Sequence, residues 1–176
     1  FLNVNQIKDF LNWRKEFKEA LFETSSGYKS IDQIAKDYKL KLVTEYGKMS
    51  KRYFNTIDPE EICEQYGADT LRCYEMFLGP LEEHKPWNVN GITGVEGFLK
   101  KIWNLSHRLD TSPPTDEQLK VLHKTIKKAT EGIEDLAFNT VISAFMIAVN
   151  QWTKQKYINK EIFSSFLILL SPFAPH

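Results

Sequence analysis

Two lysines three residues apart form the part of this sequence with the clearest capacity for chemistry. They lie in the run Lys48-Met49-Ser50-Lys51, directly after a glycine that can act as a hinge. On a mobile loop both ammonium groups can reach one triphosphate, and the serine adds a hydroxyl donor. Preorganised cations stabilise the charge that builds on phosphate oxygens as pyrophosphate leaves more than they stabilise the ground state. Taken alone, four such residues are more simply interpreted as a solvated basic turn. The surrounding sequence must decide between that interpretation and a phosphate-binding loop.

The residues after this run carry strong helix signals. Asp58-Pro59-Glu60-Glu61 supplies an N-cap, a proline at the first helical position and two acids in the first turn, and Gly67 ends the helix after about two turns. A second helix is predicted over Ala68–Leu78, where Gly79-Pro80 stops it. The stretch Leu81–Gly91 is predicted to be an extended connector. Two short helices therefore follow the lysine run at close range.

Four longer amphipathic segments complete the chain. Their apolar residues recur at the spacing of one helical face, and Thr115 with Gln118 matches a capping box at the start of the second segment. Short breaks such as Ser112-Pro113-Pro114 separate them, so we expect a mainly α fold, a helix bundle. The signals are Phe98, Ile102, Leu105 and Leu109 in the first segment, Leu119, Leu122, Ile126 and Ala129 in the second, and the apolar stretches Phe138–Trp152 and Glu161–Leu170.

Residues 1–46 have a different pattern and predict a small mixed α/β region ahead of the bundle. A break at Ser25–Gly27 divides the region, a charged helical pattern covers Ile31–Tyr38, and the alternating run Lys39–Tyr46 predicts a strand. An aromatic and apolar cluster opens it, comprising Phe10, Leu11, Trp13, Phe17 and Phe22.

Composition limits the classes of protein that fit. The chain has 23 basic and 23 acidic residues and no net charge, so any contact with nucleic acid must come from a local patch. Cys63 and Cys73 lack the spacing of metal ligands and are expected to be reduced and buried, and no metal site is expected. No apolar run has the roughly 18 residues that a membrane span needs, and no signal peptide is visible at the first residues. A soluble, cytoplasmic protein is therefore expected.

The lysine run and its continuation resemble a known enzyme family. Lys48-Met49-Ser50-Lys51, followed by Tyr66-Gly67-Ala68-Asp69-Thr70-Leu71-Arg72, is similar to the second signature loop of class I aminoacyl-tRNA synthetases and the helix behind it. The blocks from Tyr74 to Glu82, Lys85-Pro86-Trp87 and Gly91 to Val95 resemble leucyl-tRNA synthetases of the bacterial type. Phe98 to Trp103 and the terminal Ser171 to His176 resemble the helical bundle of that family.

This resemblance implies roles for particular residues. Lys48 and Lys51 would be catalytic, gripping the departing phosphates, and Lys48, Met49, Ser50 and Lys51 would contact ATP. Magnesium would accompany ATP, and the parent reaction would join leucine to tRNA-Leu. By position, residues 1–46 look like the trailing part of a leucine-specific insertion with a lead-in strand, 47–90 the signature loop and stem-contact helices, and 91–176 the tRNA-binding bundle, truncated. The family usually has serine where this chain has Arg52, which is either a third cation or an exposed arginine.

Basic residues on two bundle helices are the candidate tRNA contacts. Lys120, Lys124 and Lys128 recur at intervals of four residues, so they share one face of their helix. Together with Lys100, Lys101 and Arg108 on the preceding helix they could follow an RNA backbone. The plainer interpretation of both sets is a solvated face, and the two interpretations are left open.

The sequence also lacks parts that the parent reaction needs. No His-x-Gly-His first signature occurs in the 176 residues, and no leucine pocket or editing domain can be found. We therefore expect the chain to be a fragment that is inactive alone and works with the remainder of a synthetase chain. Two other functions fit the helical pattern without explaining the lysine run, namely a freestanding helical RNA-binding module and a helical protein-interaction domain.

Overall fold

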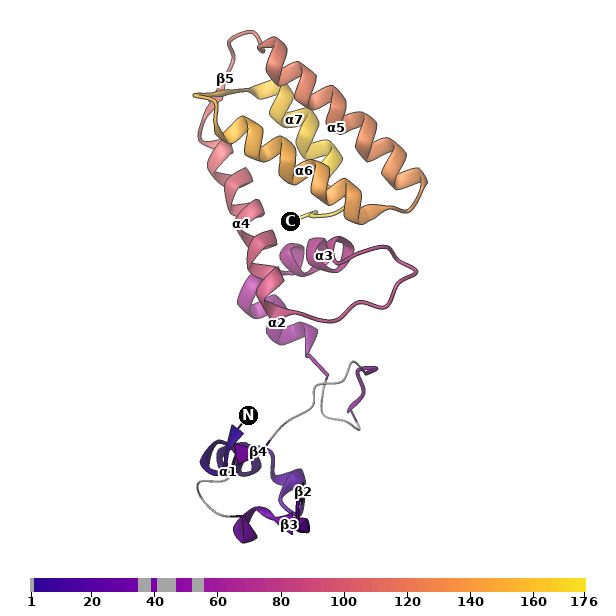
Figure 1. Ribbon diagram of the computed structural model, residues 1–176. Helices are drawn as coiled ribbons and strands as arrows, with labels where there is room; N and C mark the ends of the chain where they lie inside the picture. The colour runs from indigo at the N-terminus through magenta and orange to yellow at the C-terminus, as the bar shows by residue number, and fades with distance from the viewer. Residues whose placement is uncertain (1, 35–38, 41–46, 52–55) are drawn as a thin grey trace. The chain divides into compact units, whose positions relative to one another are not determined.

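The computed structural model describes every residue except 1, 35–38, 41–46 and 52–55 (Figure 1). Its contacts divide the chain into two compact units, Phe1–Lys48 and Met49–His176, which we call the N-terminal unit and the helical unit. Each unit is described by itself. The mainly α fold with a small mixed region is confirmed, whereas the three-part division at 46/47 and 90/91 stays a prediction.

The N-terminal unit combines one helix with two small antiparallel pairs of strands. The first and last strands pair with each other, and the middle two form a hairpin whose turn includes Gly27 at φ +102°. In chain order the elements are β1 (Leu2–Asn3), α1 (Val4–Trp13), the 3-10 turn η1 (Lys15–Phe17), β2 (Leu21–Thr24), β3 (Gly27–Ser30), the 3-10 turn η2 (Ile31–Gln33) and β4 (Lys39–Leu40).

Three expectations for this unit can be compared with the structure, and the first needs correction. The helix predicted over Ile31–Tyr38 is wrong at its start, because a single 3-10 turn ends at Ile34, whose backbone is extended. Only Lys39–Leu40 of the predicted strand is seen, because 41–46 lie outside the described residues. The expected aromatic cluster is also only partly a core. The described core holds Leu11 with Ile7, Ile31 and Ile34, while Trp13 is 72% exposed.

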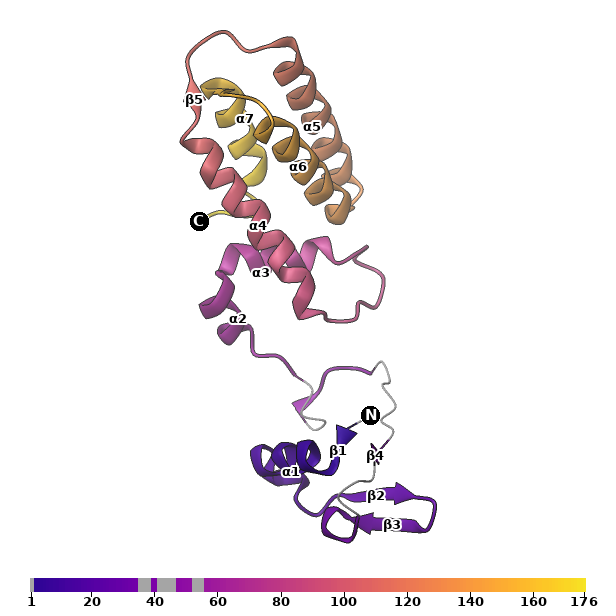
Figure 2. The same cartoon turned by 60° about the vertical axis from the view of Figure 1, so that its left-hand side comes forward.

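The helical unit contains the predicted helices, with two corrections. The helix that carries Phe98 begins at Val89, inside the connector predicted over Leu81–Gly91, and it ends at Ser106. Leu109 was predicted on its apolar face but lies in a short strand, where it pairs with Ile158. Figures 1 and 2 show α5, α6 and α7 lying side by side, and α4 leading from the α2–α3 pair to the far end of that group. The elements are α2 (Pro59–Tyr66), α3 (Ala68–Phe77), α4 (Val89–Ser106), β5 (Leu109–Asp110), α5 (Asp116–Glu134), α6 (Phe138–Thr153), β6 (Ile158–Asn159) and α7 (Lys160–Leu170).

Local chemistry sets the boundaries of these helices. The Asp58 carboxylate accepts a hydrogen bond from the Glu60 N–H at 2.9 Å, which caps α2 as the sequence predicts. Gly67 at φ +88° then separates α2 from α3, a conformation in which a side chain would be strained. Thr115 caps α5 by accepting from the Gln118 N–H at 3.2 Å. The breaks read from the sequence are thus the breaks in the structure.

The core of the helical unit is built around aromatic rings. Phe145 on α6 meets Phe166 of α7 and Phe173 beyond it edge to face, with ring centroids 5.5 and 5.4 Å apart. Trp152 is fully buried and packs edge-on against Phe166 at 5.3 Å. Such contacts add to the stabilisation from apolar burial. The α5 and α6 backbones approach closely at Gly132, where an added Cβ would lie 2.5 Å from Val141 Cγ2.

Gln118 departs from the predicted capping box. Its side chain is buried rather than folded back on the start of the helix, since the amide nitrogen donates to Gln155 Oε1 at 2.9 Å and to the Tyr157 carbonyl at 3.0 Å. Its amide oxygen accepts from the Asn159 N–H at 3.2 Å. Asn159 in turn caps α7 through the Glu161 and Ile162 N–H groups. One buried amide thus ties α5 to β6 and the start of α7, next to the short parallel pairing of β5 with β6.

Candidate functional site

The signature segment, Lys48-Met49-Ser50-Lys51, precedes α2 and is open to solvent. Lys48, Met49 and Lys51 are exposed, and Ser50 is half-buried. The boundary between the two units falls between Lys48 and Met49, so each lysine is described within its own unit. Arg52, the position that departs from the family pattern, lies outside the described residues. The assignment of the segment to ATP stays a prediction, and its exposure leaves the ammonium groups accessible.

Further along the chain, α3 packs closely against the connector to α4 and the start of α4. Tyr74 is buried, and its hydroxyl donates a hydrogen bond to the Asn88 carbonyl at 2.5 Å. Trp87 packs edge-on against Tyr74 with ring centroids 5.3 Å apart. Gly91 approaches so closely that an added Cβ would lie 2.8 Å from the Tyr74 hydroxyl. Burial raises the pKa of Tyr74, and it raises the pKa of the buried Cys73 thiol to about 12, which keeps that thiol protonated and unreactive.

The candidate cations of α4 and its end are engaged within the protein. Lys100 Nζ lies 2.5 Å from Glu96 Oε1, and Lys101 Nζ donates to Asn150 Oδ1 at 2.8 Å. Arg108 donates to the carbonyls of Thr153 and Lys156 at 3.2 and 3.4 Å, just where α6 ends. A cation at that position satisfies carbonyls that the helix leaves without partners. Arg108 therefore has a structural task, and a nucleic-acid contact for these three residues stays a prediction.

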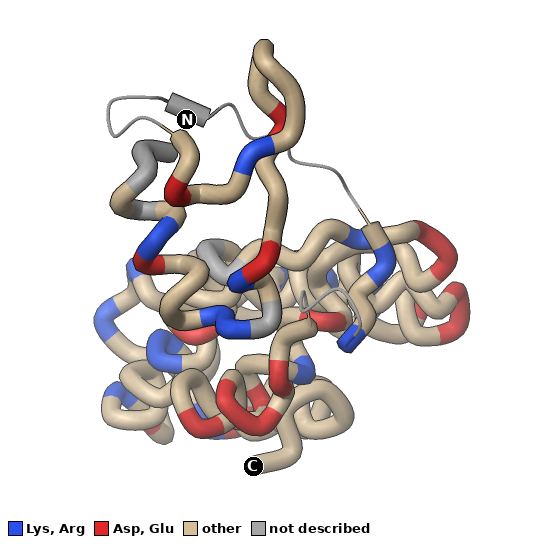
Figure 3. Tube along the Cα trace, turned by 90° about the horizontal axis from the view of Figure 1, so that it is seen from below, with Lys and Arg blue, Asp and Glu red and all other residues tan. Residues whose placement is uncertain are grey.

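The candidate cations of α5 are in a different state. Lys120, Lys124 and Lys128 are exposed, and within the described part of the chain none of them has an ion-pair partner. Their neighbour Lys127 pairs with Glu131 at 3.7 Å. Figure 3 shows basic and acidic residues interspersed along the trace, so the number of charges does not distinguish α5.

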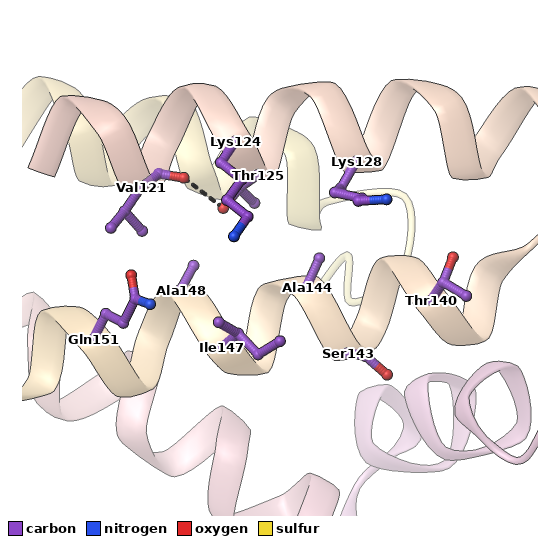
Figure 4. A pocket seen from close by; sticks show the side chains of 10 residues that line it. All are labelled: Val121, Lys124, Thr125, Lys128, Thr140, Ser143, Ala144, Ile147, Ala148 and Gln151. Atoms are coloured by element: carbon purple, nitrogen blue, oxygen red, sulfur yellow. Dashed lines mark hydrogen bonds between the residues drawn. The ribbon is translucent and has the colours of Figure 1, made fainter.

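Lys124 and Lys128 also border a groove between α5 and α6, of about 370 Å³ (Figure 4). Its floor is mostly apolar and includes Ile147, which is 56% exposed, while hydroxyl and amide groups lie along the α6 side. Two unpaired cations beside an apolar floor suit a chain of alternating phosphates and sugars. The lining residues are Val121, Lys124, Thr125 and Lys128 of α5, and Thr140, Ser143, Ala144, Ile147, Ala148 and Gln151 of α6.

The sequence alone does not reveal this groove, nor the contacts that Asp69 and Arg72 of α3 make with the end of the chain. The groove depends on which helix lies beside α5, and residue spacing within one helix carries no such information. The position of Asp69 and Arg72 shortly after Gly67 suggests a helix cap and a local ion pair, but the structure gives both residues distant partners. Asp69 contacts His176, and Arg72 donates to the carbonyls of Pro172 and Phe173.

The described residues hold neither a metal-binding cluster nor a membrane-spanning helix. They contain no group of three or more His, Cys, Asp or Glu side chains arranged to hold a metal ion. Among them, no helix is both long enough and apolar enough to cross a membrane. Cys63 and Cys73 are both free thiols, with Cys73 buried and Cys63 half-buried.

Comparison with known proteins shows what this chain is similar to. Residues 117–176 match the family model described as the anticodon-binding domain of tRNA ligase. The chain is 49% identical over 97% of its length to the leucine–tRNA ligase of Christiangramia forsetii, and 48% identical over 99% to that of Phocaeicola vulgatus. It spans only 17% and 18% of those proteins, about a sixth of their length.

A solved structure shares the fold. The LeuRS of Agrobacterium radiobacter K84, crystallised as a ternary complex with tRNA and LeuAMS, superposes with a TM-score of 0.63 at 25% sequence identity. The match covers 73% of this chain and 20% of that one.

Proposed function

We propose that this chain, which is similar to one segment of the leucine–tRNA ligases, supplies two surfaces to the complete enzyme. One is the signature segment, which holds the phosphates of ATP. The other is the face of α5 beside the α5–α6 groove, which holds the backbone of tRNA-Leu. The observation that carries the proposal is an exposed signature segment in a chain that matches these ligases over nearly all of its length.

The first step of the proposed reaction activates leucine. The leucine carboxylate attacks the α-phosphorus of ATP, the bond to the bridging oxygen breaks, and diphosphate leaves with the electron pair. The ammonium groups of Lys48 and Lys51 meet the charge that gathers on the leaving oxygens, while the Ser50 hydroxyl donates a hydrogen bond and Met49 carries the backbone past the nucleotide. Because this charge appears mainly in the transition state, the lysines raise the rate of the step.

In the second step the leucyl group passes to the terminal adenosine of tRNA-Leu, and AMP is released. The helical unit contributes by holding the tRNA. Phosphates of the RNA backbone lie against Lys124 and Lys128, with Lys120 further along the same helix. Lys100, Lys101 and Arg108 are secondary, because their present partners would have to be given up.

Magnesium is implied by the family resemblance but does not fit this segment. The described residues offer no cluster of carboxylates for it, so no step above passes through the metal. Its ligands in the complete enzyme would be the ATP phosphates and residues of other segments.

The test of this proposal uses the full-length synthetase that carries this segment. Lys48→Ala and Lys51→Ala should each lower the rate of leucyl-adenylate formation, on the order of 10²–10³, with little change in the KM for leucine. Pre-steady-state measurement of adenylate formation gives both quantities, and Lys29→Ala, an exchange of an N-terminal hairpin lysine, is the matched control. If both variants form adenylate at the parent rate, the segment is a basic turn and its catalytic role is withdrawn.

A further inference from the structure

Two charged residues of α3 reach across the helical unit to the segment that follows α7. We propose that Asp69 and Arg72 are positioning residues that fasten α3 to Pro172–His176, so that the helices behind the signature segment and the tRNA-binding bundle keep one orientation during tRNA charging. The proposal rests on the proposed function, because it assigns ATP chemistry to one side of this contact and tRNA binding to the other.

The contact consists of four polar interactions between residues about 100 positions apart. Asp69 accepts from the backbone N–H of His176 at 2.9 Å, and His176 Nδ1 lies 3.1 Å from the other carboxylate oxygen. Arg72 donates from Nη2 to the Pro172 carbonyl at 3.0 Å and from Nε to the Phe173 carbonyl at 3.3 Å. A planar guanidinium can address two neighbouring carbonyls at once, which a lysine ammonium on a flexible stem does less well.

The receiving segment is itself held firmly by the bundle. Phe173 is only 2% exposed, and its ring meets Phe138 and Phe145 of α6 edge to face at 6.0 and 5.4 Å. Its backbone N–H also donates to the Leu170 carbonyl at the end of α7. A hydrogen bond to the backbone of this segment is therefore a hydrogen bond to the bundle as a whole.

Apolar contact between α3 and α6 brings these parts together but leaves their angle loosely defined, because burial has little directional preference. Hydrogen bonds weaken steeply when donor and acceptor are misaligned. Four of them, spread over two residues one turn apart on α3, resist both rotation and sliding of that helix. The second turn of α3 is thereby oriented by the far end of the bundle, not only by its neighbours in sequence.

The position of α3 in the chain gives this orientation a functional meaning. The signature segment leads into α2, and α2 joins α3 directly at Gly67. On the other side, the α5–α6 groove shares α6 with the rings that hold Phe173. Loosening the contact should therefore slow the transfer of the leucyl group to tRNA, which needs the bound tRNA aligned with the adenylate. Adenylate formation needs no tRNA and should be unaffected.

The test compares two activities of the full-length synthetase carrying this segment. Asp69→Ala and Arg72→Ala should lower kcat/KM for tRNA charging about tenfold, the size expected for one hydrogen bond to a charged group. Leucine-dependent ATP–diphosphate exchange without tRNA should stay within about twofold. Asp69→Asn, which keeps an oxygen acceptor for the His176 N–H, should recover most of the charging activity, and Arg72→Lys should recover less. Glu75→Ala, an exposed acid on the same helix, is the control.

Three outcomes would overturn the proposal. Exchange and charging falling in parallel, together with a lower Tm, would mean that the contact only supports folding. Unchanged charging in both alanine variants would mean that it does nothing for the reaction, and equal effects from Glu75→Ala would remove its specificity. The proposed function fails separately, through a parent enzyme whose exchange does not depend on Lys48 and Lys51.

Discussion

The lysines of the signature segment and those of α5 carry the same side chain in two different settings. Lys48 and Lys51 lie on a short segment outside the α-helices and strands, whereas Lys124 and Lys128 project from a capped helix of nineteen residues whose other face is buried. A loop can follow a charge that appears during a reaction, while a helix holds cations at fixed spacing for a ligand whose charge is already there. The element that carries a lysine therefore determines whether its ammonium group suits a developing charge or a ligand that is already charged.

The largest expected effect is on the isolated chain. The 176 residues contain the α5 lysines with the helices that hold them, but they lack the first signature and a leucine pocket. The reactants of adenylate formation therefore cannot be aligned. Purified chain should therefore show no leucine-dependent ATP–diphosphate exchange above a blank. It should still shift tRNA in a gel, because the α5 setting needs only its own helices. Exchange by the isolated chain would refute the claim that the signature segment depends on other parts of the enzyme.

Charge reversal on α5 should have the next largest effect. In the full-length enzyme, Lys124→Glu with Lys128→Glu should raise the KM for tRNA about tenfold or more and leave adenylate formation alone, and adding Lys120→Glu should raise it further. Losing two phosphate contacts should also reduce the slope of log Kd against log salt by roughly two. Lys127→Glu, beside them but paired with Glu131 and outside the groove, is the matched control. If Lys127→Glu raises the KM for tRNA equally, the groove has no specific part in tRNA binding and this face of α5 is merely solvated.

The smallest effect, and the sharpest comparison, comes from exchanging lysine for arginine in both settings. Lys51→Arg should slow adenylate formation several-fold, because a broad planar fork does not replace a compact charge at a closely fitted phosphate. Lys124→Arg should leave the KM for tRNA within about twofold, since any cation of similar reach can follow a backbone. Single-turnover rates and tRNA titrations measure the two quantities. If Lys51→Arg forms adenylate at the parent rate, Lys51 needs only a cation of similar reach, as Lys124 does, and the proposed difference between them is wrong.

The sequence predicted the helices well because their boundaries depend on local chemistry. The caps at Asp58 and Thr115 and the positive φ of Gly67 act within a few residues, so their signals can be read directly. In the N-terminal unit the same approach was less successful. Of the charged helical pattern that begins at Ile31, the described residues form a 3-10 turn over Ile31–Gln33, with Ile34 extended and both isoleucines in a small core.

The candidate sites divide in the same way. The signature segment is visible as four consecutive residues, and no pairing of helices is needed to find it. The groove could not be predicted, because it is lined by residues of two helices, α5 and α6, and depends on how these helices lie beside each other. The contacts of Asp69 and Arg72 join residues about 100 positions apart. A polar residue near the start of a helix suggests a cap, and only the folded chain reveals a distant partner.

The buried amide of Gln118 makes the assembly of this bundle selective. Apolar helix faces tolerate many packings that differ by a small slide, because one buried methyl group can replace another at low cost. The amide does not allow that exchange. Any slide of α7 along α5 would separate Gln118 from the Asn159 N–H and from the Tyr157 carbonyl, and each buried group left unpaired costs about 1–3 kcal/mol. A single buried side chain thus fixes the register of α7 against α5, and packings shifted along the helix axis are disfavoured.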